Sequence, residues 1–148
     1  MKRAAITPLR PVVLISTLAA ATLQCAVPAG PSDSVAATVV TAERNASGIV
    51  RFDVDWRNLG AVPVYLAGCG GEVSMWLERR GPAWEGFGGG ICIANLDQRP
   101  VRLDPGQVVR ASVGVGPGDG GEYRAVTSVS DELGRESGLV RSPSAHVP

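Results

Sequence analysis

The side chains that usually carry enzymatic chemistry are scarce in this sequence. His146 is the only histidine, two residues before the last position, and Lys2 is the only lysine. A Ser-His-Asp triad needs a histidine to activate its serine, and a Schiff base needs a lysine. The inventory therefore argues against these reactions and against multi-histidine metal sites. We expect a protein that is not an enzyme.

Asp53 and Asp55 stand two positions apart, and such a pair can act as acid and base or bind calcium. In the run 48–57, however, polar residues alternate with apolar ones, and Arg51 and Arg57 flank the two acids. This alternation is typical of a strand with one wet face. We predict a solvated row of charges here, and we expect no metal and no cofactor.

The chain has three cysteines, Cys25, Cys69 and Cys92. Their spacing does not supply the three or four close ligands of a zinc site. If Cys25 is lipidated or removed, an even pair remains in an exported domain, where disulfides persist. We predict a Cys69–Cys92 disulfide, which closes a loop of about 24 residues and contributes roughly 3 kcal/mol through loop-closure entropy.

The first 25 residues resemble an export signal. Basic residues precede Val12–Leu23, an apolar run too short for a membrane span of about 20 residues but long enough for a signal peptide. Cys25 directly follows, as in bacterial lipoproteins, although Gln24 replaces the usual small residue. A signal peptidase cut before Gly30 is the alternative. We favour lipidation of Cys25, followed by a flexible tether over 26–34.

The body of the chain has a period of two rather than 3.6, which predicts β-strands. Turn signals separate the alternating runs every 8 to 12 residues or so, as in all-β sandwiches. We predict an immunoglobulin-like antiparallel β-sandwich of seven to nine short strands over 35–141, and a loose tail over 142–148. A small barrel is the alternative. The predicted strands are 35–43, 48–57, 62–66, 72–80, 91–94, 101–103, 108–115, 123–129 and 137–141.

Composition limits the partners. From Ala26 onward 11 arginines face 14 acidic residues, a net charge of 11 − 14 = −3. Nucleic-acid-binding proteins normally carry a basic excess, so we expect no nucleic acid partner. Hydrophobic residues make up 45% of the chain, enough for a packed core.

Several motifs resemble those of immunoglobulin-like domains. Asp119-Gly120-Gly121-Glu122-Tyr123 fits the D-x-G-x-Y pattern that places a tyrosine corner, although Ala125 stands where a core cysteine is usual. With Asn58 and the turn Leu103-Asp104-Pro105-Gly106, the layout from Val35 to Val129 resembles the intracellular proteinase inhibitor family of Bacillus. That resemblance implies a small sandwich and, as a second function, proteinase inhibition through an exposed loop.

The glycine-rich segment 84–90 is predicted to be a loop. It lacks the Lys-Ser/Thr of a phosphate-binding loop. It does carry two large aromatics, Trp84 and Phe87, beside Cys92. A flexible connection is the simple interpretation, and partner contact by Trp84 and Phe87 is the functional one.

The sequence thus predicts a non-catalytic domain of the bacterial cell envelope that binds or supports another macromolecule. It is held to the membrane by a lipid on Cys25, or is periplasmic or secreted if that residue is removed. A proteinase-inhibitor-like module is the alternative function. The sequence does not identify the partner.

Overall fold

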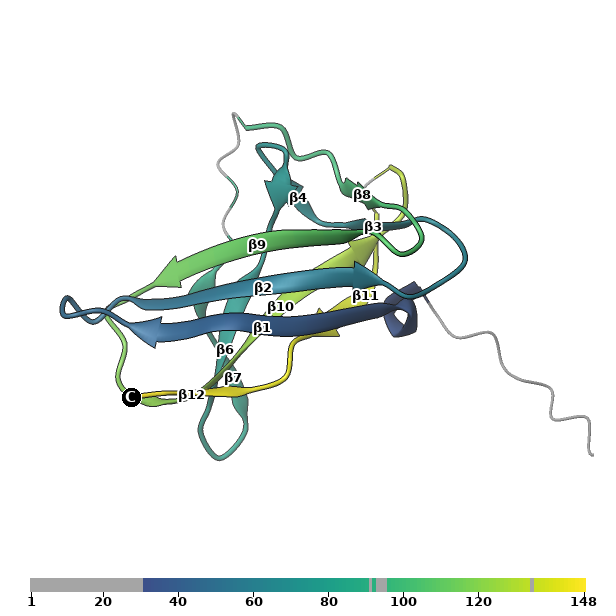
Figure 1. Cartoon of the computed structure of the whole chain (residues 1–148). Helices are drawn as coiled ribbons and strands as arrows, with labels where there is room; N and C mark the ends of the chain where they lie inside the picture. The colour runs from purple at the N-terminus through teal and green to yellow at the C-terminus, as the bar shows by residue number, and fades with distance from the viewer. Residues whose placement is uncertain (1–30, 91, 93–95, 134) are drawn as a thin grey trace, which may run out of the picture.

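A computed structural model describes residues 31–90, 92, 96–133 and 135–148 (Figure 1). The predicted signal segment, Cys25 and residues 26–30 of the predicted tether lie outside the described residues. Within them the chain forms strands and one short 3-10 helix, η1 (Pro31–Ser34). The strands are β1 (Val35–Arg44), β2 (Val50–Asn58), β3 (Val64–Leu66), β4 (Gly68–Cys69), β5 (Glu72–Val73), β6 (Trp76–Arg80), β7 (Trp84–Gly89), β8 (Val101–Leu103), β9 (Val108–Val115), β10 (Gly121–Ser130), β11 (Glu136–Arg141) and β12 (Ala145–Val147).

The first sheet has the order β1-β2-β9, and both pairings are antiparallel. Its central strand β2 shows the predicted alternation. The side chains of Val50, Phe52, Val54 and Trp56 are fully buried, whereas the residues between them point outward. A strand with this pattern needs a second apolar layer on its buried side.

The second sheet is built around β10, whose partners are all antiparallel. Val126 pairs with both β6 and β11, and Tyr123 pairs with both β6 and β12. Val129 likewise pairs with both β3 and β11. Strands β3 and β6 therefore follow one another along one side of β10, and β11 and β12 follow one another along the other. Strands β8 and β7 extend the sheet beyond β3 and β6.

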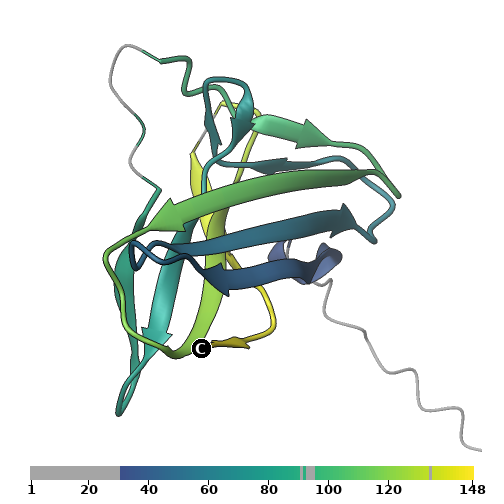
Figure 2. The same cartoon turned by 60° about the vertical axis from the view of Figure 1, so that its left-hand side comes forward.

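The two sheets face each other across one hydrophobic core, and their strands cross in the view of Figure 2. Leu66, Leu77, Leu103, Tyr123 and Val129 from the second sheet are fully buried against the inner face of the first. Burying such side chains contributes about 1.5–3 kcal/mol each, before the entropy of ordering the chain is subtracted. The prediction of an all-β, immunoglobulin-like antiparallel sandwich is confirmed.

Two boundaries differ from the predictions. Residues 142–148 were expected to form a loose tail, but Ala145–Val147 form β12 on the edge of β10. The side chain of Val147 is fully buried, which supplies the free energy that orders this segment. At the other end, Pro31–Ser34 of the expected tether are folded as η1, which lies against β11.

The structure describes more strands than the seven to nine that were predicted, because Trp84–Gly89 and Ala145–Val147 also form strands and the chain is interrupted between β3 and β6. Between β3 and β6 the chain leaves the sheet as the small β4–β5 ribbon and then returns. Hydrogen bonds from Ala67 N to Ser128 O and from Thr127 Oγ1 to Ser74 O mark the two ends of this excursion. Of the predicted strand 91–94, only Cys92 lies among the described residues, and it is not in a strand.

Candidate functional site

The segment expected to be a glycine-rich loop is a strand. Trp84–Gly89 pairs with β6 as β7, so the prediction of an exposed loop is wrong. The glycines are explained by packing. A Cβ at Gly88 or Gly89 would lie 2.6 Å from a methyl group of Val115 or Val113 in β9. Glycine thus lets this edge of the second sheet approach the first. The proteinase-inhibitor hypothesis loses the loop on which it depended.

The two aromatics of β7 lie on opposite faces. Phe87 points inward, where its ring meets the ring of Tyr123 edge-on at 5.3 Å between centroids. Trp84 points outward and lies beneath the guanidinium of Arg124, 4.1 Å from the ring centroid, with Arg80 at 5.3 Å. Both side chains are only partly exposed. They therefore do not form one exposed pair of anchors, and a contact with a partner has to involve them separately.

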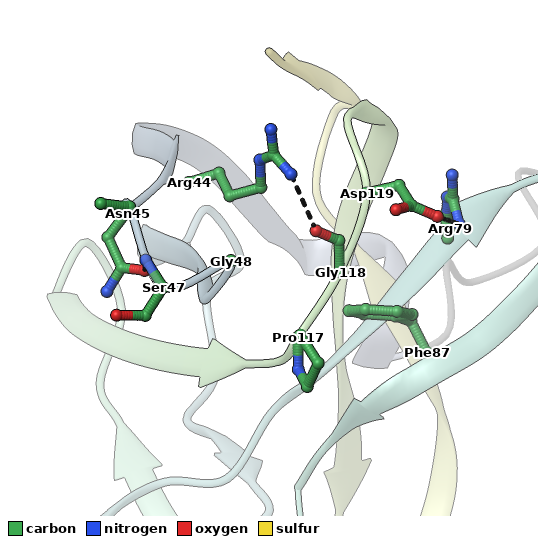
Figure 3. Close-up of a pocket in the computed structure, with 10 residues that line it drawn as sticks. Arg44, Asn45, Ser47, Gly48, Arg79, Phe87, Pro117, Gly118 and Asp119 are labelled. Carbon is green, nitrogen blue, oxygen red and sulfur yellow. Dashed lines mark hydrogen bonds and ion pairs between the residues drawn. The ribbon is translucent and has the colours of Figure 1, made fainter.

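Phe87 borders a cavity of about 530 Å³ at one end of the sandwich (Figure 3). We call it the end pocket. On one side lies the turn between β1 and β2, and on the other lie Phe87 and Arg79. The connection from β9 to β10 passes between them. The lining residues are Arg44, Asn45, Ala46, Ser47, Gly48, Arg79, Phe87, Pro117, Gly118 and Asp119.

Local hydrogen bonds hold the walls of the end pocket in place. The side-chain oxygen of Asn45 accepts hydrogen bonds from Ser47 N and Ile49 N, both at 2.9 Å. Asparagine side chains commonly bond to nearby backbone groups in this way in turns. Gly48 O accepts from Gly118 N at 2.9 Å and so joins the two loops. A Cβ on Gly118 would lie 2.5 Å from the tip of the Phe87 ring, so glycine is required there.

Two arginines and one acid set the charge of the end pocket. Arg44 donates from Nη1 to Gly118 O at 3.3 Å and from Nε to Pro148 O at 3.1 Å. Arg79 donates to Gly120 O at 3.2 Å and pairs with the exposed Asp119 at 3.4 Å. Two guanidiniums against one carboxylate leave an excess of positive charge. Such a site favours an acidic group.

Asp53 and Asp55 lie where the alternation predicted, on the outer face of the first sheet. Asp53 contacts Arg51 at 3.2 Å and accepts from Ser112 Oγ at 2.6 Å, and Asp55 pairs with Arg110 at 2.7 Å. The hydrogen bond from Ser112 lowers the pKa of Asp53, and that from Arg110 lowers the pKa of Asp55. Both groups are thus held as carboxylates, which suits a row of ion pairs and not a general acid.

The predicted disulfide joins Cys69 to Cys92 in the structure, with a Cα–Cα distance of 5.5 Å. It fixes the β4–β5 ribbon to the segment that follows β7. In the part of the chain that is described, no three His, Cys, Asp or Glu side chains gather as metal ligands would. Across the same residues no helix has the length and apolar character to span a membrane.

Sequence reasoning missed the end pocket. Arg44, Arg79 and Asp119 are far apart in the chain, and each looks like an ordinary charged residue at a strand end or turn. The one signal was the pair of turn sequences Asn45-Ala46-Ser47-Gly48 and Gly116-Pro117-Gly118-Asp119. Turns at the same end of a sandwich must lie close together, but their sequences do not reveal that they enclose a cavity.

Comparison with known proteins does not place the chain in a family. No family model matches it. No curated protein matches it either. These two results leave the predicted resemblance to the Bacillus proteinase inhibitors without support.

Solved structures give only distant likenesses. A crystal structure of the CARDB domain of a Pyrococcus furiosus protein, in complex with di-metal ions, is 15% identical with a TM-score of 0.39, covering 78% of this chain and 86% of that one. A solution structure of the same domain is 13% identical with a TM-score of 0.39, covering 77% and 94%. The DNA glycosylase AlkC of Pseudomonas fluorescens is 11% identical with a TM-score of 0.36, covering 78% of this chain and 30% of that one. TM-scores this low carry no argument about this chain.

Proposed function

We propose that this protein is a non-catalytic module of the bacterial cell envelope, which binds an acidic region of another macromolecule at its end pocket. The observation that carries this proposal is the position of the pocket. Strand β1 runs from η1 at one end of the sandwich to the pocket at the other, a ten-residue span of roughly 33 Å (Figure 1). A chain anchored ahead of Pro31 therefore presents the pocket away from its anchor.

The lining of the end pocket supports binding rather than catalysis. Arginine and aromatic side chains are the residues that most often dominate the energetics of protein interfaces, and Arg44, Arg79 and Phe87 lie together here. Arg79 and Phe87 lie on the paired strands β6 and β7, and hydrogen bonds of Asn45 and Gly118 tie the turn that follows Arg44, so little backbone ordering is needed before a partner binds. No histidine, lysine or cysteine lines the pocket. Its described lining holds one hydroxyl, that of Ser47, and one carboxylate, that of Asp119, which is paired with Arg79.

Anchoring is supported by the sequence. The basic start, the apolar run Val12–Leu23 and Cys25 follow one another in the order of a lipoprotein signal. In cells fed a labelled fatty acid, the wild-type protein should carry label and Cys25→Ser should not. A mature chain that begins at Gly30 and carries no label would instead indicate a soluble exported protein, and would leave the end pocket as the binding site of that form.

Binding is tested by filling the pocket. Ala46 is an exposed residue on its rim, and Ala61 is an exposed residue in the turn at the opposite end. Ala46→Trp should reduce crosslinking of the native partner in envelope preparations at least tenfold, whereas the matched Ala61→Trp should not. Both variants should melt within a few degrees of wild type. Equal capture by the two variants would overturn the assignment of the end pocket.

A further inference from the structure

Strand β9 is an edge strand of the first sheet. It pairs with β2 through eight consecutive residues, Val108–Val115 against Val50–Arg57, with no shift of register. Among the described strands β2 is its only partner, so β9 ends the first sheet. In an antiparallel edge strand every second residue turns its N–H and C=O away from the sheet. This edge therefore has backbone N–H and C=O groups without a partner strand, and its second half, 112–115, lies beside β5 and β7.

The other outer strands carry the protections that sheet edges usually have. Strand β1 has a register shift between Val39 and Thr41, which β9 lacks. The β6–β7 pairing and the β10–β11 pairing each contain a shift, and β8 and β12 have only three residues each. Strand β9 has no proline, no lysine and no bulge. Its one charged residue, Arg110, is bonded to Asp55 on the outer face.

A groove runs beside the open edge. It has a volume of about 360 Å³ and lies between Ser112–Gly114 of β9 and the β4–β5 ribbon, with Gly89 and Gly90 at its side. The glycines lack side chains that would keep a guest backbone away. The ribbon is fixed by the Cys69–Cys92 disulfide, so this wall of the groove is covalently held. The groove therefore leaves space for a guest backbone beside Ser112–Gly114.

One charge lines the groove among the described residues, the carboxylate of Glu72. Its side chain is exposed, and no described residue forms an ion pair with it. An unpaired carboxylate beside a row of free backbone groups complements a peptide strand that carries a lysine or arginine. The outer face of the added strand would continue that of β9, where Ser112 and Gly114 leave room.

We propose that the β9 edge takes up an extended polypeptide segment of another protein as an additional antiparallel or parallel strand, with a basic side chain of the guest beside Glu72. Main-chain hydrogen bonds to β9 supply the affinity. Glu72 and the groove supply the preference for guest segments that carry a basic side chain. This goes beyond the proposed function, because it is a second site that stands whether or not the end pocket binds a partner.

The test uses a phage library of random linear twelve-residue peptides, selected on the disulfide-bonded protein. Selected peptides should lack proline in their centre, alternate in polarity and contain lysine or arginine. Binding of the synthetic peptides is then measured to edge variants. Because N–H groups alternate along a strand, one of Ser112→Pro and Val113→Pro loses only an outward N–H. The variant that retains the wild-type melting temperature is the edge-blocked protein.

The edge-blocked protein should bind the selected peptides at least tenfold more weakly than wild type. Glu72→Lys should also weaken binding, whereas Glu132→Lys, the same charge change in a distant exposed turn, should not. Ala46→Trp at the end pocket should leave peptide binding unchanged, which separates this site from the proposed function. The proposal is overturned if no peptide is enriched, or if peptides bind the edge-blocked protein as well as wild type. Light scattering that shows a dimer lost in the edge-blocked protein would assign the edge to a second copy instead.

Discussion

Asn58 shows how one buried polar side chain fixes the end of the sandwich nearest η1. Its amide nitrogen donates to Val62 O at 2.8 Å and Leu103 O at 2.9 Å, and its oxygen accepts from Gly60 N at 2.8 Å. The side chain is fully buried, so leaving any of these groups unpaired would be costly. The sequence marked Asn58 only through a family resemblance. The structure assigns it a structural role.

Tyr123 is the second residue whose role is local and testable. Its hydroxyl donates to Asp119 O at 2.6 Å, four residues earlier, which is the tyrosine corner predicted from the D-x-G-x-Y pattern. Tyr123→Phe should lower the free energy of unfolding by about 1 kcal/mol, the net value of one hydrogen bond. Urea unfolding measures this directly. An unchanged free energy of unfolding would mean that the hydroxyl contributes nothing to the corner.

Asp55 gives a prediction about pH. The bond from Arg110 lowers the pKa of Asp55 in the folded protein below its ordinary value of about 3.9. The stabilisation from this pair is therefore fully present above about pH 4, and it is lost as the pH falls through the folded-state pKa. Asp55→Asn should make the loss of stability between pH 4 and pH 2 shallower in urea unfolding. This prediction is contradicted if the free energy of unfolding of Asp55→Asn falls between pH 4 and pH 2 as steeply as that of wild type.

At the level of elements, strands that bury one face could be predicted well from the sequence. The prediction failed where contacts with strands distant in the sequence determine the structure of a segment. Strand β2 alternates between fully buried and outward residues, so its buried face could be predicted from its amino-acid sequence alone. Strand β7 could not, because its glycines are required by contact with Val113 and Val115 of a strand distant in the sequence. The interruption between β3 and β6 was equally hidden, since the run 72–80 keeps one alternation throughout.

The β4–β5 ribbon depends on the disulfide. It has only two residues in each strand, and a ribbon that short is not stable alone. Replacing both Cys69 and Cys92 with serine should lower the free energy of unfolding by roughly 3 kcal/mol, from the entropy of the released loop. Urea unfolding measures this change in the free energy of unfolding. Non-reducing peptide mapping of the wild type tests whether the Cys69–Cys92 disulfide is present. Free thiols in envelope-purified protein would contradict it.

At the scale of the whole molecule, the two proposed binding sites lie on different parts of the sandwich. The first described element, η1, lies at one end, the opposite end holds the end pocket, and the β9 edge runs between the two ends along one side (Figures 1 and 2). The fold class predicted from the sequence is confirmed, whereas the anchor signal stays a prediction. The sequence did not predict the pocket, because Arg44, Phe87 and Asp119 meet only when both sheets and their connections are in place.

The central claim is that a partner contacts the end pocket, and the most direct measurement is site-specific photocrosslinking in producing cells. A photoreactive amino acid is placed at Ser47 on the pocket rim or, in a matched variant, at Ala61 in the turn at the opposite end. We expect one strong crosslinked species from position 47, absent from position 61 and absent when position 47 is combined with Ala46→Trp. Crosslinks of equal strength from both positions, or from position 61 alone, would contradict it.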